Sequence, residues 1–104
     1  LYVGGMGARQ KNFYNDIFAR SGYAAEAKQI QDLYLAGDKK AAEAAIPDDY
    51  LARNSLIGPE GFVRERLQAL RESGVNALNV GFLGQTTAER VAQCERLRKL
   101  VDTL

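Results

Sequence analysis

The sequence contains no histidine and a single cysteine, Cys94. Without histidine, the chain lacks the most common general base and the most common transition-metal ligand in proteins. A Ser-His-Asp or Cys-His hydrolase therefore cannot be assembled from these residues alone, and the sequence predicts no metal site. One cysteine cannot form an internal disulfide, which favours a reducing, cytoplasmic location.

The chain also has no excess of charge of either sign and no long apolar run. It carries 14 Lys and Arg against 13 Asp and Glu, so its formal net charge is +1. This balance indicates neither nucleic acid nor an anionic membrane as a partner. No apolar run approaches the roughly 20 residues that span a bilayer, and the first residues, LYVGG, lack the regions of a signal peptide.

The first half of the chain, residues 1–54, is predicted to be helical. A helix over residues 11–21 is expected to end at Gly22, because glycine commonly follows a helix C-terminus. A second helix over residues 24–36 is expected to end at Gly37 for the same reason.

Further helix boundaries are marked by aspartate, proline, glycine and threonine. Asp38 is typical of the N-cap of a short alanine-rich helix. A later helix is expected to have Pro59 at its first position and Gly74 after its end, and Thr86 with Glu89 fits a capping box. The side chains expected on buried helix faces are Phe13, Tyr14, Ile17, Phe18, Ala27, Ile30, Leu33 and Tyr34, followed in the second half by Phe62, Val63, Leu67, Leu70, Val91, Cys94, Leu97, Leu100 and Val101.

The second half, residues 55–104, is predicted to alternate strands and helices. Residues 55–58 (SLIG) form a short apolar run, and residues 75–83 (VNALNVGFL) have the pattern of a strand that is buried on both faces. One face carries Leu78, Val80 and Phe82, and the other carries Ala77, Asn79 and Gly81. The order strand, helix, strand, helix predicts parallel pairing with a right-handed crossover.

Two strands do not form a stable sheet in water, so this βαβα unit needs further strands. The fold class expected from the pattern is therefore α/β. The 104 residues, which begin with Leu1 rather than methionine, are expected to form a single segment at the end of a larger α/β protein.

Residues 4–15, GGMGARQKNFYN, resemble a phosphate-binding loop only superficially. Both common glycine patterns would need glycine at position 10, where Gln10 stands, and Asn12 replaces the hydroxyl residue that follows lysine in a P-loop. The stretch therefore favours a glycine-rich connection between two helices. Met6, Arg9 and Lys11 remain candidates for lining a site beside a helix N-terminus.

Asn79 is the polar residue that stands out in the second predicted strand. Its interpretation as a buried amide with satisfied hydrogen bonds is favoured, because most buried polar groups are paired. The alternative is a polar group near a pocket, because the segment ends in residues 81–84 (GFLG), where α/β sheets and barrels bind ligands.

Two long stretches resemble the luciferase-like monooxygenase family, and in particular its branch that uses the deazaflavin coenzyme F-420. The first is LYVGGMGARQKNFYNDIFARSGY followed by IQDLYLAGDKKAAEAAIPDDY, and the second is SLIGPEGFVRERLQALRESGVNALNV. The YVGGMG and KNFYN motifs indicate the deazaflavin branch, and the second stretch resembles a pattern found throughout the wider family.

The resemblance implies the C-terminal part of a TIM (β/α)8 barrel. Residues 55–104 would supply its last two strands and their helices, and residues 1–54 a helical region that precedes them. It also implies hydride transfer between a reduced cofactor, coenzyme F-420 or alternatively FMN, and a small organic substrate. The cofactor would supply the redox chemistry, and the protein would position it.

The resemblance places ten residues near a cofactor or substrate pocket, without assigning a role to any of them. The family's first six strands carry most of its cofactor contacts and acid/base residues, so no catalytic residue is assigned in this chain. The ten residues are Gly4, Gly5, Met6, Gly7, Lys11, Asn12, Ser55, Gly58, Asn79 and Gly81.

An alternative function is that of a non-catalytic, truncated α/β module. Such a module would cover its open sheet edges by self-association or by binding a partner. The expected macromolecular partner is accordingly either a second copy of the chain, which would give a homo-oligomer, or the N-terminal part of the barrel.

Overall fold

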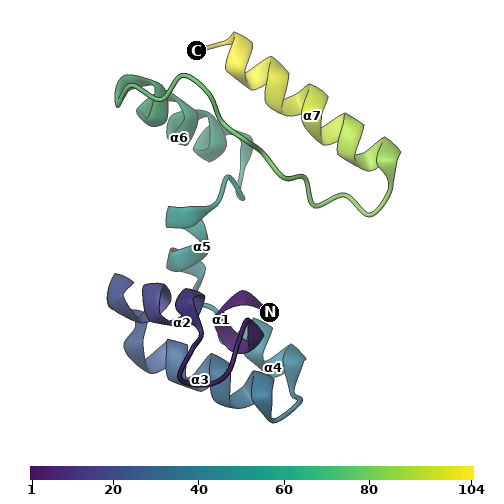
Figure 1. Cartoon of the computed structure of the whole chain (residues 1–104). Coiled ribbons are helices and arrows are strands. Elements are labelled where there is room, and N and C mark those ends of the chain that lie inside the picture. The colour runs from purple at the N-terminus through teal and green to yellow at the C-terminus, as the bar shows by residue number, and fades with distance from the viewer. The chain divides into compact units, whose positions relative to one another are not determined.

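The computed structural model describes all residues of the chain, 1–104, and contains helices but no β-strand (Figure 1). The chain divides into two compact units, Leu1–Ser55 and Leu56–Leu104. No helix combines the length and the apolar character that crossing a membrane requires.

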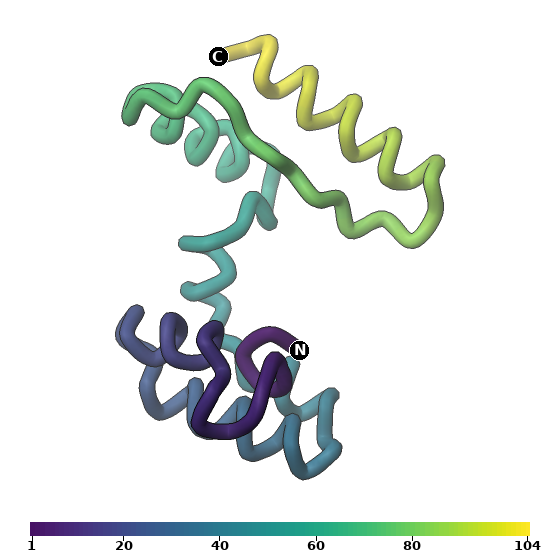
Figure 2. Tube along the Cα trace, in the orientation of Figure 1, coloured from purple at the N-terminus to yellow at the C-terminus, as the bar shows by residue number.

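The first unit contains six helical elements, and its path is easily followed in the Cα trace (Figure 2). The chain reverses direction between α2 and α3 at Gly22, whose φ of 101° is readily adopted by glycine. The elements are α1 (Tyr2–Gly5), α2 (Phe13–Phe18), the π-helical turn η1 (Ala19–Tyr23), α3 (Ala24–Leu35), α4 (Lys39–Ala44) and α5 (Asp48–Asn54).

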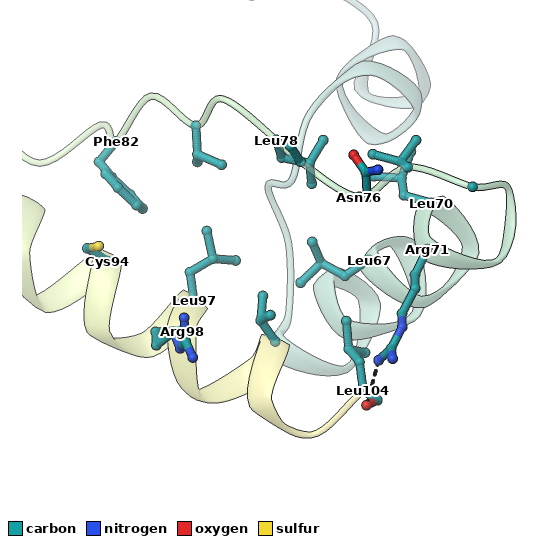
Figure 3. Close-up of a pocket in the computed structure, with 15 residues that line it drawn as sticks. Leu67, Leu70, Arg71, Asn76, Leu78, Phe82, Cys94, Leu97, Arg98 and Leu104 are labelled. Atoms are coloured by element: carbon teal, nitrogen blue, oxygen red, sulfur yellow. Dashed lines mark hydrogen bonds between the residues drawn. The ribbon is translucent and has the colours of Figure 1, made fainter.

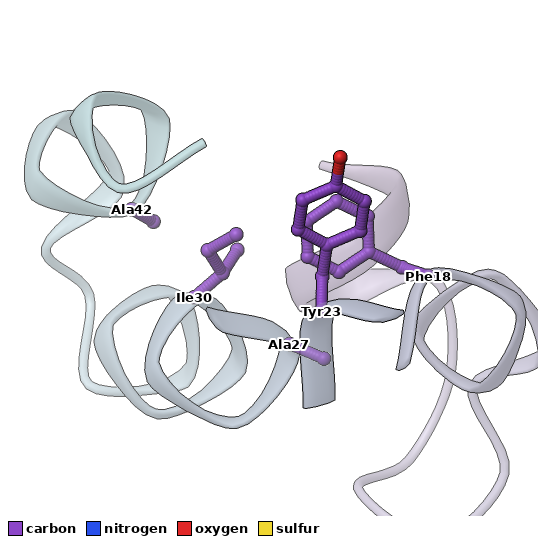
Figure 4. Packing of buried hydrophobic residues seen from close by; sticks show 5 residues of the cluster. All are labelled: Phe18, Tyr23, Ala27, Ile30 and Ala42. Atoms are coloured by element: carbon purple, nitrogen blue, oxygen red, sulfur yellow. The ribbon is translucent and has the colours of Figure 1, made fainter. Parts of the chain in front are cut away.

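Aromatic and small side chains form the core of this unit. Phe18 is fully buried, and its ring stacks on Tyr23 with a centroid separation of 5.2 Å (Figure 4). Tyr50 meets the Phe18 ring edge-on at 4.5 Å. Ala27 and Ile30 of α3 complete the buried cluster together with Ala42 of α4, so the core joins α2, η1, α3 and α4.

A hydrogen bond fixes the polar end of Tyr23 in this cluster. The Tyr23 hydroxyl donates to Asp49 Oδ2 at 2.7 Å. This hydrogen bond to the Asp49 carboxylate is the main reason why the pKa of Tyr23 is raised above its usual value of 10.0. The first turn of α5 is thereby connected to the aromatic core.

The predicted apolar stripe of α2 is only partly correct. Phe18 is buried as expected, but Phe13, Tyr14 and Ile17 are exposed. The inward face of this short helix instead carries Asn15 and Phe18, which are three residues apart and so lie on one side. In the α3 region, Ala27 and Ile30 are buried, and Leu33 and Tyr34 pack partly buried against the core.

Local helix signals are confirmed in both units. The Asp38 side chain caps α4 by accepting a hydrogen bond from the Ala41 N–H. In the second unit, Thr86 Oγ1 accepts from the Glu89 N–H at 3.2 Å, while the Glu89 carboxylate accepts from the Thr86 N–H at 3.0 Å. Two orphan N–H groups are satisfied in this way, and the last helix begins at the predicted place.

The second unit consists of α6 (Glu60–Glu72) and α7 (Thr87–Asp102), joined by an extended segment. The α/β fold class, with its final part of a TIM barrel, was wrong for this chain, because residues 55–58 and 75–83 form no β-ladder. A strand is defined by hydrogen bonds to a neighbouring strand, and these two segments do not pair with each other. The helices form without such a partner, because the N–H and C=O groups of a helix hydrogen-bond to each other within the same segment.

Burial in the second unit is correspondingly sparse. Val63 and Leu67 of α6 are buried, whereas Leu78 and Val80 of the extended segment are 46% and 39% exposed. No residue of α7 is buried, although an apolar face was predicted there. The expected burial of residues 75–83 on both faces was therefore wrong, because no element covers the segment's second face.

Replacing Phe18 by alanine should destabilise the first unit strongly. Truncation of a buried phenylalanine typically costs about 3–5 kcal/mol, and that is comparable with the whole stability of a small domain. Urea unfolding followed by circular dichroism should therefore show a much lower midpoint or a loss of helical signal. Phe13→Ala is the matched control, because the 67% exposed Phe13 ring should change stability by less than about 0.5 kcal/mol. Equal effects of the two substitutions would contradict the assigned core.

Candidate functional site

The stretch from Gly4 to Asn15 runs from the end of α1 into α2, and its residues 6–12 connect the two helices, as predicted. It folds back on itself, since the Lys11 N–H donates to the Ala8 carbonyl at 2.8 Å. Six of the ten predicted site residues lie in this stretch: Gly4, Gly5, Met6, Gly7, Lys11 and Asn12. The candidate site is therefore built around this glycine-rich loop.

Gly4 and Gly5 allow α1 to lie directly against Tyr34 of α3. A Cβ atom on Gly4 would be 2.4 Å from Tyr34 Cβ, and one on Gly5 would be 2.1 Å from Tyr34 Cε1. Both distances are far below van der Waals contact. The two glycines are thus required by helix packing, and the space beside them is already filled by the tyrosine.

Glycine is needed at position 7 for a different structural reason. Its φ is 126°, which L-residues with a side chain rarely adopt, and a Cβ atom there would lie 2.5 Å from the Lys11 carbonyl oxygen. The tight return of the loop therefore needs glycine at this position.

Asn12 is buried and ties the loop to α1. Its Nδ2 donates to the carbonyl oxygens of Tyr2 at 3.0 Å and Val3 at 3.1 Å. Its Oδ1 accepts from the Asn15 N–H at 3.0 Å and so caps α2. Both amide protons of Asn12 are used within the protein, which explains why an amide can be buried here.

Two further amides, neither of them predicted from the sequence, complete this connection. Asn15 Nδ2 donates to the carbonyls of Val3 at 2.9 Å and Ala27 at 2.8 Å, joining α1 to α3. The buried Gln31 donates through Nε2 to the Arg9 carbonyl at 3.1 Å. The available signals were the three-residue spacing of the asparagines and the position of Gln31 beside the inward-facing Ile30.

Charges surround the same loop. Asp32 of α3 pairs with the guanidinium of Arg9 and, at 2.7 Å, with the ammonium of Lys28. The hydrogen bond from Lys28, and after it the one from Arg9, holds the pKa of Asp32 below its ordinary value of 3.8. Lys11 is exposed and makes no ion pair. Arg9 is therefore neutralised, whereas the charge of Lys11 is available to an anion.

Exposed aromatic rings lie close to the loop in sequence and pack on one another. The rings of Tyr2 and Tyr14 meet edge-on with centroids 4.9 Å apart, and Phe13 and Tyr14 do so at 5.8 Å. All three rings are exposed, and Met6 is 41% exposed. Residues 2–14 thus expose apolar rings, a thioether and an ammonium without an ion pair, which are groups that suit a ligand with a flat ring and a negative charge.

The other four predicted site residues are not part of this loop. Ser55 follows α5 and is partly buried, while Gly58, Asn79 and Gly81 are exposed in the second unit. The interpretation of Asn79 as a buried, satisfied amide was wrong, because its side chain is exposed and makes no hydrogen bond. No group of three or more Cys, Asp or Glu side chains is arranged to hold a metal ion.

The second unit contains an apolar pocket of about 700 Å³ between α6, the extended segment and α7. Figure 3 shows Leu67, Leu97 and Phe82 directed into it. Cys94 also lines the pocket and is exposed, so its predicted burial as a small apolar residue was wrong.

Comparison with known proteins gives two matches. Residues 1–77 match the family described as luciferase-like monooxygenases. Over 80 residues the chain is 32% identical to a protein of Mycobacterium tuberculosis named "putative coenzyme F-420-dependent oxidoreductase", and the match covers 77% of this chain and 23% of that protein. The chain thus spans about a quarter of this relative's length. No solved structure matches.

Replacing Gly4 by alanine should loosen α1 from α3. The added Cβ would meet Tyr34 Cβ, which cannot move away by a side-chain rotation, so we expect a loss of about 1–3 kcal/mol in the free energy of unfolding. Denaturant titration followed by circular dichroism measures this loss.

Gly61→Ala is the control for this substitution. Gly61 lies within α6 with no atom near the position of an added Cβ, so alanine there should be neutral or stabilising by up to about 1 kcal/mol. If Gly4→Ala were as well tolerated as Gly61→Ala, the packing role of Gly4 would be contradicted.

Proposed function

The chain belongs to the luciferase-like monooxygenase family, and we propose on that basis that the protein is an oxidoreductase that transfers a hydride between reduced coenzyme F-420 and a small organic substrate. The observation that carries the proposal is the family match over residues 1–77, which includes the whole glycine-rich loop. The choice of the deazaflavin over FMN follows the name of the mycobacterial relative.

The surface around the loop fits such a cofactor in part. A deazaflavin or flavin cofactor combines a flat ring system with a phosphate group. The Lys11 ammonium makes no ion pair in the protein and would bind the phosphate, while the exposed rings of Tyr2, Phe13 and Tyr14 would contact apolar parts of the ligand. Met6 would add a polarisable contact.

The glycines of the loop do not leave open space for a cofactor. The space beside Gly4 and Gly5 is occupied by Tyr34, and that beside Gly7 by the Lys11 carbonyl. Asn12 uses both of its amide protons on α1. We therefore assign these four residues to building the loop, and Met6 and Lys11 to contacting the ligand.

The bound cofactor would supply the hydride chemistry. The residues of this chain would act by position and environment: Lys11 would hold a negative charge at the loop, and the aromatic side chains would exclude water from the ligand's apolar surface. Residues 1–104 contain no histidine, so this part of the chain would supply no imidazole for proton transfer.

Fluorescence titration of the purified protein with coenzyme F-420 and with FMN tests this function. We expect saturable binding of the deazaflavin. Lys11→Met should weaken it roughly tenfold, because a charge-assisted hydrogen bond contributes about 1.5 kcal/mol. Lys40→Met is the matched control, because Lys40 is an exposed lysine of α4 outside the loop, and it should leave the affinity unchanged.

The outcomes separate the parts of the proposal. Failure of the protein to bind either cofactor would contradict the oxidoreductase function. Preferential binding of FMN would contradict the choice of cofactor. Unchanged affinity in Lys11→Met, with deazaflavin bound, would contradict the role of Lys11 alone.

A further inference from the structure

A β-turn at residues 8–11 determines where Lys11 lies in the glycine-rich loop. The Ala8 carbonyl accepts a hydrogen bond from the Lys11 N–H at 2.8 Å, which places Arg9 at the corner of the turn. The carbonyl of Arg9 takes no part in this hydrogen bond. The group that binds this carbonyl therefore lies outside the turn, and it fixes the turn against the rest of the unit.

Gln31 of α3 is the residue that binds the corner of the turn. Its Nε2 donates to the Arg9 carbonyl at 3.1 Å, although the two residues are 22 positions apart in the chain. The Gln31 side chain is buried, and the neighbouring Ile30 belongs to the core of the unit. Separating a buried amide from its partner is unfavourable, because both groups then lose a hydrogen bond. The turn is thereby anchored to a helix of the core.

Arg9 is also held through its side chain. Its guanidinium pairs with Asp32, whose carboxylate is shared with the Lys28 ammonium at 2.7 Å. Two consecutive residues of α3 thus bind the backbone and the side chain of one loop residue. Gln31 is the uncharged member of this pair, so replacing it releases the turn without altering the charge near an anionic ligand.

We propose that Gln31 is a positioning residue for ligand binding. By fixing the corner of the turn, it fixes the backbone from which Lys11 directs its ammonium to a negatively charged group of the cofactor. A loop that already has its binding conformation in the free protein loses less conformational freedom when the ligand binds. The inference rests on the proposed function, and Gln31 acts through the turn rather than by touching the ligand.

The affinity of the purified protein for coenzyme F-420 tests this role. Gln31→Met keeps an unbranched side chain of similar length in the buried position but removes the amide. It should raise the Kd about fivefold, because one hydrogen bond of ordinary strength no longer holds the turn. Gln29→Met is the matched control: Gln29 is an exposed glutamine of the same helix, and its replacement should leave the Kd unchanged.

A double substitution distinguishes positioning of Lys11 from a general effect on the unit. If Gln31 acts through Lys11, Gln31→Met should cause no further rise in the Kd in a Lys11→Met background, so the two effects should not add. The same rise in both backgrounds would overturn the proposal, because Gln31 would then act independently of Lys11. An unchanged Kd in Gln31→Met alone would overturn it as well.

Amide hydrogen exchange in the ligand-free protein tests the anchoring itself. The Lys11 N–H closes the turn and should exchange about fivefold faster in Gln31→Met than in the native protein or in Gln29→Met. The Ala42 N–H, which donates to the Asp38 carbonyl in α4, should exchange at the native rate in all three. A parallel rise at both amides would indicate loss of the fold rather than release of the turn, and would overturn the proposal.

The two measurements keep this inference separate from the proposed function. Native exchange of the Lys11 N–H in Gln31→Met would overturn the anchoring even if coenzyme F-420 binds. Failure of the native protein to bind coenzyme F-420, with faster exchange in Gln31→Met, would contradict the proposed function and with it the role of Gln31 in binding, while the anchoring of the turn would stand.

Discussion

The fit of α1 against α3 is the constraint on which the loop and its surface depend. Two glycines remove the side chains that would hold α1 away from Tyr34, and two asparagines then satisfy the carbonyls at the end of this short helix. A four-residue helix cannot pair its own backbone fully. The side-chain amides of Asn12 in the loop and Asn15 in α2 therefore donate the hydrogen bonds that a further helical turn would supply. These bonds fix the path of the loop and with it the positions of Met6 and Lys11.

This constraint separates two kinds of residue within one family-like stretch. Gly4, Gly5, Gly7 and Asn12 are needed to build the loop, so packing alone explains their presence in this chain. Met6 and Lys11 have no such structural reason, since both are exposed and the Lys11 side chain makes no ion pair in the fold. Substitutions of Met6 and Lys11 are therefore the most informative tests of a functional role for the loop.

Local features of the fold could be predicted from the sequence, and non-local ones could not. Gly22, Gly37, Asp38 and the Thr86–Glu89 box act within a few residues of themselves, and the structure confirms all of them. The two strands failed because a strand depends on partners elsewhere, whatever its own pattern. The exposure of Cys94 has the same cause, because its burial would need another element packed over that face of α7.

The candidate site shows the same division. The loop itself and its role as a connection between helices could be derived from spacing. The contacts that explain its residues could not, because Tyr34 lies about thirty positions from Gly4 and Asn15 reaches the carbonyl of Ala27, twelve positions away. The exposed side of α2 was mispredicted for a related reason: the buried face includes an asparagine, whose burial depends on distant carbonyls.

The most direct test of this account is the free energy of unfolding of Asn12→Asp. Aspartate keeps the acceptor that caps α2 but loses both donors to α1 and places a carboxylate beside the carbonyls of Tyr2 and Val3. A loss of about 1–3 kcal/mol is expected at neutral pH, because buried polar groups lose their partners. An unchanged free energy of unfolding would contradict it and would show that Asn12 is not the tie between the loop and α1.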